Sequence, residues 1–291
     1  MRLNRFLAAA GLGSRRSCEE LILRGSISVN GTYVRDLATR ISDEDDVRVH
    51  GRTVHAIATR TILLNKPAGY TTTRGDRHAE RTIFDLLPSD CGHLFHVGRL
   101  DRESEGLLLL TNDGAMAQEL MHPSKGIEKE YEVVVDRPFG PKDAAALLKG
   151  TWIEGSVARV QSMRTLGPTK IMVILHQGLK RQIRVMLGQL GFKVQRLVRV
   201  RLGPLTLRGV KPGSYRELRP EDLEALRKAA AAPKPKKPSS PRKPKALKFT
   251  NFTVVPASPK KATDSALAPK KPRKTSPTGE RVKKGEGRLK G

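Results

Sequence analysis

The stretch GRLDRESEGLLLLTNDG, residues 98–114, decides the fold of the larger part of this chain. It places four charged side chains within residues 101–105 and follows them with the uninterrupted leucine run 107–110. An apolar run of this kind that ends at Asn-Asp-Gly predicts a short buried strand followed by a turn. The charged loop would lie at the edge of a rigid strand, which is a good mount for a catalytic carboxylate. The alternative is a solvated charged turn between two core strands.

This stretch resembles the signature GRLDxxSxGLLLLTNDG of the pseudouridine synthases that modify ribosomal RNA, in the branch of the small-subunit enzyme and its large-subunit relatives. The match spans 17 residues with specific polar positions, and the resemblance covers most of residues 1–228. It implies that the chain isomerises uridine to pseudouridine, that Asp101 is the catalytic residue and that Arg99 binds substrate.

Composition bounds the possible classes of protein. A length of 291 residues allows about two domains plus tails, and 37% apolar residues suit ordinary cores. No apolar run approaches the roughly 18 residues of a membrane span, and the N-terminus lacks the pattern of a secretory signal. Cys18 and Cys91 lie in different predicted domains without metal-ligand spacing, which fits a cytoplasmic protein and argues against a disulfide framework or a zinc site.

The net charge of +26 indicates a polyanionic partner, and nucleic acid is the default. Residues 229–291 hold 18 Lys and Arg against three acidic residues, a net charge of +15, which leaves +11 for residues 1–228. This segment also holds ten prolines and predicts a disordered basic tail. We expect the tail to raise RNA affinity by releasing counterions. A solubility or sorting tail is the alternative.

Residues 1–50 predict a small N-terminal domain. Apolar side chains at helical spacing mark residues 2–10, and Ser14 is a good N-cap for a second helix to Arg24. A strand at 27–29 with Asn-Gly directly after it predicts a tight turn. The pattern resembles the alpha-L RNA-binding module of a small-subunit ribosomal protein and tyrosyl-tRNA synthetases. The arginines expected to grip RNA are Arg2, Arg5, Arg15, Arg16 and Arg24. The alternative is a solvated helical face.

Residues 51–60 predict a linker, and TILLNKPAGY at 61–70 predicts a strand and turn that resemble the first motif of the same family. The basic residues expected to approach RNA here are Lys66, Arg74, Arg77 and Arg81. Ordinary surface charge is the alternative for each. His93 and His96 have no partners at ligand spacing, so structural roles are favoured over metal binding.

Further elements follow along the chain. We expect a short helix capped by Thr82, helices at 115–122, 141–149 and 220–228, and strands at 93–97, 128–136, 157–164, 169–176 and 196–207. Three of these segments resemble late family motifs. The resemblance implies that Tyr131 stacks on the target base, that Arg184 pairs with the catalytic carboxylate and that Leu197 packs against the base. The loop before Arg184 departs from the family pattern at Gln177, Leu179 and Lys180.

The resulting prediction is an α+β protein with an alpha-L domain at 1–50, a linker at 51–60, a catalytic domain with a mixed, mainly antiparallel sheet at 61–228, and a tail at 229–291. The predicted partner is ribosomal RNA or a pre-ribosomal particle, and large-subunit RNA is favoured over small-subunit RNA. The protein is predicted to be a cytoplasmic monomer. Uridine and pseudouridine contain the same atoms, so no cofactor or metal is expected, and no phosphate-binding glycine motif occurs. The alternatives are a non-catalytic RNA-binding assembly factor and an RNA methyltransferase on the same module.

Overall fold

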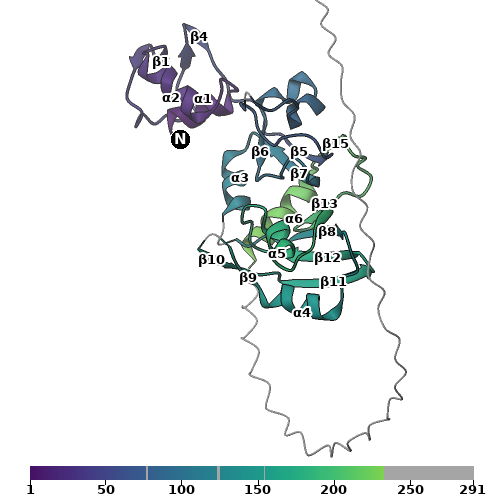
Figure 1. The fold of residues 1–291 in the computed structure, drawn as a ribbon. Helices are drawn as coiled ribbons and strands as arrows, with labels where there is room; N and C mark the ends of the chain where they lie inside the picture. The colour runs from purple at the N-terminus through teal and green to yellow at the C-terminus, as the bar shows by residue number, and fades with distance from the viewer. Residues whose placement is uncertain (77, 123–124, 154, 233–291) are drawn as a thin grey trace, which may run out of the picture. The chain divides into compact units, whose positions relative to one another are not determined.

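The computed structural model describes residues 1–76, 78–122, 125–153 and 155–232. Three sequence predictions fall on other residues. Arg77, expected near RNA, Pro123, expected to end a helix, and nearly all of the predicted basic tail lie outside the described residues. Figure 1 shows the described elements in chain order.

The N-terminal elements form a small α+β unit with its own core. They are α1 (Leu3–Ala9), α2 (Arg15–Leu23), β1 (Ile27–Val29), β2 (Thr32–Val34), β3 (Val47–Val49) and β4 (Arg52–Thr53). The strands form one antiparallel sheet in the order β2-β1-β3-β4. Leu7, Ile22 and Ile27 are among the fully buried residues that join the helices to the sheet.

Local signals in this unit act as predicted. The Ser14 hydroxyl accepts a hydrogen bond from the Ser17 N–H at 3.1 Å and so caps α2. Asn30 and Gly31 have φ of 49° and 81°, the left-handed pair that a two-residue hairpin turn requires. The expected linker at 51–60 is wrong in its first part, because β4 extends the sheet there.

The second group of elements is built on a nine-stranded sheet. Its path is β11-β12-β8-β13-β7-β5-β15, with β14 paired to β13 and β6 paired to β7. The strands are β5 (Thr61–Lys66), β6 (Phe95–Val97), β7 (Glu105–Thr111), β8 (Lys129–Val135), β11 (Ser162–Gly167), β12 (Lys170–Leu175), β13 (Val194–Leu202), β14 (Leu205–Thr206) and β15 (Tyr215–Glu217). Among the described pairings of this sheet, only β13 with β7 is parallel. The predicted mixed, mainly antiparallel α+β fold is confirmed.

The leucine run lies at the centre of this sheet, where both faces are covered. Leu108 and Leu110 are fully buried in the core on one face, while Leu107 and Leu109 are fully buried in the core on the other. A central strand of this kind needs apolar side chains at every position rather than at alternate positions. The buried strand predicted at 107–110 is therefore confirmed.

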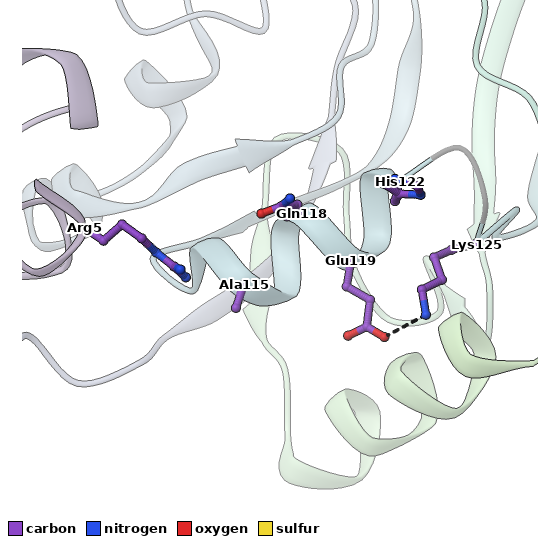
Figure 2. Close-up of a pocket in the computed structure, with 6 residues that line it drawn as sticks. All are labelled: Arg5, Ala115, Gln118, Glu119, His122 and Lys125. Atoms are coloured by element: carbon purple, nitrogen blue, oxygen red, sulfur yellow. Dashed lines mark ion pairs between the residues drawn. The ribbon is translucent and has the colours of Figure 1, made fainter. Parts of the chain in front are cut away.

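Helices and a separate hairpin complete this group. The helices are α3 (Gly114–Met121), α4 (Pro141–Lys149), α5 (Gln182–Gln189) and α6 (Pro220–Ala231), with 3-10 turns at Ile83–Leu86 and Ser89–His93. Strands β9 (Thr151–Ile153) and β10 (Ser156–Ala158) form the hairpin. The Asp113 carboxylate caps α3, and an ion pair of 3.6 Å joins Glu119 of this helix to Lys125 (Figure 2).

Most element predictions agree with the structure, with one clear error. The helix at 141–149 has the predicted bounds. The single strand expected at 157–164 is wrong, because these residues divide between the end of β10 and the start of β11. The chain turns between them, so that the Gln161 N–H donates to the carbonyl of Ile174 on β12.

Candidate active site

The loop that precedes β7 carries Asp101 and is fixed by the main chain around it. The Ser104 N–H donates to the Asp101 carbonyl at 3.0 Å, and the Gly69 N–H donates to the Arg102 carbonyl at 2.8 Å. The Thr72 hydroxyl, which is 2% exposed, donates to the Leu100 carbonyl at 2.8 Å. The loop is therefore attached to the turn that follows β5, as the expectation of a rigid mount requires.

Lys66 holds the same loop from inside the domain. Its side chain is 0% exposed, and its ammonium donates to the carbonyls of Ser104 at 2.7 Å, Asp101 at 3.1 Å and Arg102 at 3.2 Å. A fourth bond reaches the Pro67 carbonyl at 3.1 Å. Burial lowers the pKa of Lys66 from 10.5 to about 8, against the effect of nearby carboxylates. The expected RNA contact by Lys66 is corrected, because a fully buried ammonium with four carbonyl partners does not face RNA.

Gly106 begins the buried part of β7 and is needed for close packing. Its φ is +105°, and a Cβ atom there would lie 2.3 Å from the Arg199 carbonyl oxygen. Any other residue would therefore push β13 away from the end of the loop that carries Asp101. Across the sheet, Gly106 pairs with Arg199 and Arg199 pairs with Tyr131. Tyr131 thus lies two strands away from the loop in the same row.

Two of the three acidic side chains of the loop segment are paired with arginines. Glu103 forms an ion pair with Arg181 at 3.1 Å, and Glu105 accepts two hydrogen bonds of 2.9 Å from Arg196. The bond to Glu105 raises the pKa of Arg196. Arg181 and Arg196 lie close in sequence to the predicted site residues Arg184 and Leu197. Sequence reasoning did not predict either as a partner of the loop acids, because a sequence rich in basic residues does not show which of them faces an acid.

Asp101 is the third acidic residue of this segment, and its carboxylate is free. It is half-buried, and within the described part of the chain no hydrogen bond or ion pair uses its side-chain oxygens. The carbonyl of the same residue is fixed by Lys66 and Ser104, so the backbone is held while the carboxylate stays available. A group placed in this way can act on a bound molecule without first breaking an internal contact.

Arg184, on α5, lies against the loop but is not ion-paired with Asp101. Its guanidinium donates to the Glu103 carbonyl at 3.4 Å and to the Val194 carbonyl at 3.1 Å, while its buried Nε has no partner. Burial lowers the pKa of Arg184, whereas the carboxylates of Glu103 and Asp101 act in the opposite direction. The direct ion pair expected between Arg184 and Asp101 is absent among the residues that the structure describes, and main-chain contacts take its place.

Tyr131 and Leu197 lie on neighbouring strands of the sheet and are almost fully buried. Tyr131 is 9% exposed on β8, and Leu197 is 6% exposed on β13, with both in the same core cluster as Leu100. Leu100 directly precedes Asp101, so this core reaches the start of the loop that carries Asp101. The stacking and packing roles of Tyr131 and Leu197 stay predictions.

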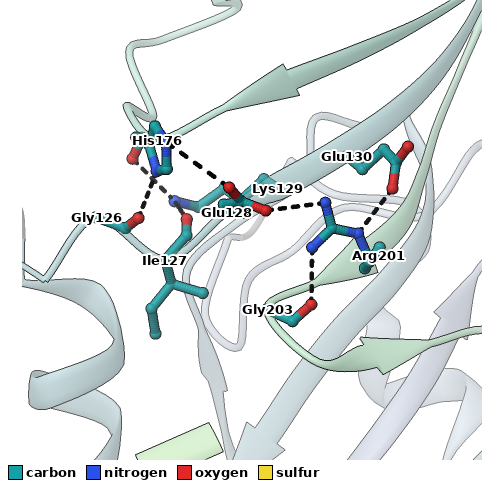
Figure 3. A network of polar contacts seen from close by, with 8 residues as sticks. All are labelled: Gly126, Ile127, Glu128, Lys129, Glu130, His176, Arg201 and Gly203. Atoms are coloured by element: carbon teal, nitrogen blue, oxygen red, sulfur yellow. Dashed lines mark hydrogen bonds and ion pairs between the residues drawn. The ribbon is translucent and has the colours of Figure 1, made fainter. Parts of the chain in front are cut away.

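A polar network surrounds the start of β8, next to Tyr131 (Figure 3). Arg201 bridges Glu128 at 3.0 Å and Glu130 at 2.7 Å, and Lys129 donates to the Ile127 carbonyl at 3.2 Å. Burial lowers the pKa of Lys129 from 10.5 to about 8, and neighbouring Arg199 lowers it further. Sequence reasoning did not predict a role for Lys129 or Arg201. The only sequence feature that could have indicated one is the alternation of basic and apolar residues on the predicted strands.

Three other predicted RNA contacts, Arg74, Arg81 and Arg99, are exposed. The Arg74 guanidinium lies 4.0 Å from the Phe84 ring centroid. Arg74 also donates a hydrogen bond to the Leu94 carbonyl, and its approach to RNA stays a prediction. The five arginines predicted to grip RNA in the N-terminal unit are all exposed: Arg2, Arg5, Arg15, Arg16 and Arg24. Arg24 pairs with Glu20 at 3.7 Å.

His93 and His96 are both half-buried, and the buried Nε2 of His93 has no hydrogen-bond partner among the described residues. His96 accepts or donates a 2.9 Å bond to the Gly98 carbonyl, and its pKa is lowered by burial. Within the described residues, no group of three or more potential ligands could hold a metal ion. A search of the same residues also finds no helix that is long and apolar enough to cross a membrane.

Comparisons with known proteins agree with this arrangement. Residues 60–189 match the family described as RNA pseudouridylate synthase, and residues 1–47 match the S4 domain. An RNA pseudouridine synthase of Aquifex aeolicus is 37% identical over 235 residues, which cover 79% of this chain and 94% of that protein. The ribosomal large subunit pseudouridine synthase B of Bacillus subtilis is 34% identical, with 79% of this chain and 96% of that protein covered. A crystal structure of a pseudouridylate synthase aligns with a TM-score of 0.57 and 26% identity, covering 78% of this chain and 99% of that chain.

Proposed function

Because this chain belongs to the RNA pseudouridylate synthase family, we propose that it isomerises uridine in ribosomal RNA, with Asp101 as the catalytic residue. The observation that supports Asp101 is its free carboxylate on a loop whose main chain is tied down on several sides. Relatives named for the large ribosomal subunit support large-subunit RNA as the substrate. Such a substrate implies a cytoplasmic location.

The reaction exchanges one bond to the ribose for another. The bond between ribose C1′ and uracil N1 breaks, the base rotates, and a bond forms between C1′ and C5. The C5 proton leaves and N1 gains a proton, so substrate and product are isomers. We expect the Asp101 carboxylate to act either as a nucleophile at the sugar or as a base toward it.

The target uridine must first leave the RNA stack, at a cost of a few kcal/mol. We propose that Tyr131 stacks on the extruded base and assists removal of the C5 proton, and that Leu197 packs against it. Both side chains lie on strands joined to the end of the catalytic loop through Arg199. Exposed Arg99 next to the loop would bind a phosphate, while the arginines of the S4 domain would hold the RNA farther along.

Arg184 has a positioning role in this proposal. Its bond to the Glu103 carbonyl keeps a cation beside Asp101 without occupying the carboxylate. A nearby guanidinium favours the ionised form of a carboxyl group that a bound uracil would otherwise desolvate. The ion pair between the two side chains would form when substrate excludes water from the site.

The direct test is incubation of the protein with ribosomal RNA, followed by mapping of pseudouridine. We expect Asp101→Asn to abolish product while RNA binding stays within about twofold. Glu103→Gln removes the same charge two residues away and breaks only an exposed ion pair, worth about 0–1 kcal/mol, so it should retain most activity. Turnover by Asp101→Asn would disprove the role of Asp101. RNA binding by the wild-type protein with no isomerised uridine would instead favour a non-catalytic assembly factor.

A further inference from the structure

The chain's single tryptophan lies exposed on the β9–β10 hairpin. Trp152 is 65% exposed, and Val157, its partner across the hairpin, is 39% exposed. Single apolar residues on a surface need no explanation, but here a large ring and a cross-strand apolar neighbour share one exposed face. The proposed uses of Asp101, Tyr131, Arg184 and Leu197 leave this face unexplained.

Two free cations flank the hairpin in sequence. Lys149 precedes it and Arg159 follows it, and both side chains are exposed without an ion pair or side-chain hydrogen bond in the part of the chain that the structure describes. The stem of Arg159 packs against Gly150, where a Cβ atom would lie 2.8 Å from its Cγ. Gly150 therefore holds Arg159 beside the start of β9. Glu154, between β9 and β10 in sequence, is outside the described residues.

The hairpin is joined to the helix that carries Arg184. The Gln182 amide of α5 donates to the Arg159 carbonyl at 3.2 Å, and the Gln189 amide donates to the Trp152 carbonyl at 3.4 Å. At its other side, the N-terminal end of α5 contacts the catalytic loop through Arg181 and Arg184. The helix advances about 10 Å between Gln182 and Gln189. A single RNA strand bound at Asp101 can thus extend along α5 to the hairpin.

We propose that Trp152 is a stacking platform for an unpaired base of the RNA strand that flanks the target uridine, with Lys149 and Arg159 binding its phosphates. An exposed aromatic ring between cations is the arrangement by which proteins hold single-stranded nucleic acid. The positive charge of residues 1–228 complements such a strand and would repel most basic partners. This inference rests on the proposed function for its choice of RNA, but its binding step is separable from catalysis.

Trp152 provides its own readout, because the intrinsic tryptophan fluorescence of the full chain comes from this residue alone. The Asp101→Asn protein is titrated with a short single-stranded RNA and, separately, with a blunt RNA duplex of the same composition. We expect the single strand to quench the fluorescence, since an unpaired base can stack on the ring. The duplex should quench it far less, because its bases are already stacked. Unchanged emission at an RNA concentration that saturates binding by anisotropy would overturn the proposal.

Variants then measure the contribution of the ring. Trp152→Ala should weaken binding of labelled single-stranded RNA by about 5- to 150-fold, the usual range for a lost base–aromatic stack. Trp152→Tyr should restore most of the binding. Leu166→Ala is the matched control, because Leu166 is 43% exposed on β11 and lies outside the hairpin. Equal binding by Trp152→Ala and Leu166→Ala would also overturn the proposal.

Two further outcomes are informative. Emission that depends on protein concentration without RNA would mean that a second copy of the chain covers Trp152, and the platform would be wrong. Measuring pseudouridine formation by the wild-type protein distinguishes failure of this inference from failure of the proposed function. Quenching by RNA without any pseudouridine would refute only the proposed activity, whereas pseudouridine formation without quenching would refute only the platform.

Discussion

Replacing Lys66 with methionine tests whether a buried ammonium fixes the catalytic loop. Methionine keeps a similar length and apolar stem but cannot donate to the four carbonyls that Lys66 now holds. The carbonyls of Asp101 and Arg102 keep a second donor, from the Ser104 and Gly69 N–H groups. For those of Pro67 and Ser104, the loop and side-chain hydrogen bonds of the described residues include no second donor.

The change in stability should be small because two effects oppose each other. Leaving two buried carbonyls without a donor costs about 1–3 kcal/mol each, or about 2–6 kcal/mol together. Removing the buried ammonium recovers about 3 kcal/mol, the free energy that corresponds to a pKa lowered from 10.5 to about 8. The net loss in the free energy of unfolding therefore lies between about −1 and +3 kcal/mol.

The loss in rate should be larger, because a displacement of about 1 Å in a catalytic group can cost about 100-fold. We expect Lys66→Met to lower the single-turnover rate of pseudouridine formation by about this factor, with RNA affinity nearly unchanged. Lys129→Met is the matched control, since Lys129 has the same lowered pKa but donates to carbonyls outside the loop. A wild-type rate in Lys66→Met would refute the positioning role. A loss of RNA binding with an unchanged rate would also refute it and would indicate that Lys66 contacts RNA.

Two further predictions concern pH and packing. The rate should fall as pH rises through about 8, where folded Lys66 loses its proton. Between pH 8 and 10.5 the unfolded chain binds more protons at Lys66 than the folded chain does, so stability rises with pH in this range. The wild type should therefore gain up to about 3 kcal/mol in the free energy of unfolding relative to Lys66→Met. Parallel thermal melts and pH–rate profiles of the two proteins measure both effects. Separately, Gly106→Ala should lower the melting temperature well beyond Gly98→Ala. Both glycines have positive φ, but only at Gly106 would the added Cβ meet backbone, at 2.3 Å, and equal melting temperatures would contradict this.

Sequence patterns were reliable where a side chain's type fixes its environment. Four successive leucines that end at a turn signal favoured a buried strand, and the structure covers both of its faces. Helix α4 begins at Pro141 and is followed by Gly150, residue types that are common at these two positions. The environments of basic side chains were harder to predict, because a long side chain can reach water, an acid or a carbonyl from the same backbone position. Lys66 therefore looked like a residue that could reach RNA, although the fold buries it completely. The exposure of Trp152 could not be predicted from the sequence either, since a tryptophan on a strand is usually part of a core.

The pairing of the loop acids gives a physical reason why Asp101, rather than its neighbours, would do the chemistry. Glu103 and Glu105 lie in the same segment, but each is held by an arginine, so using either on a substrate would require an ion pair to break. Lys66 and Arg184 contribute positive charge to the segment through main-chain carbonyls and leave the Asp101 side chain open. Positive charge is thereby supplied without occupying the reactive oxygens, and a bound uridine would meet the one carboxylate that has no competing partner.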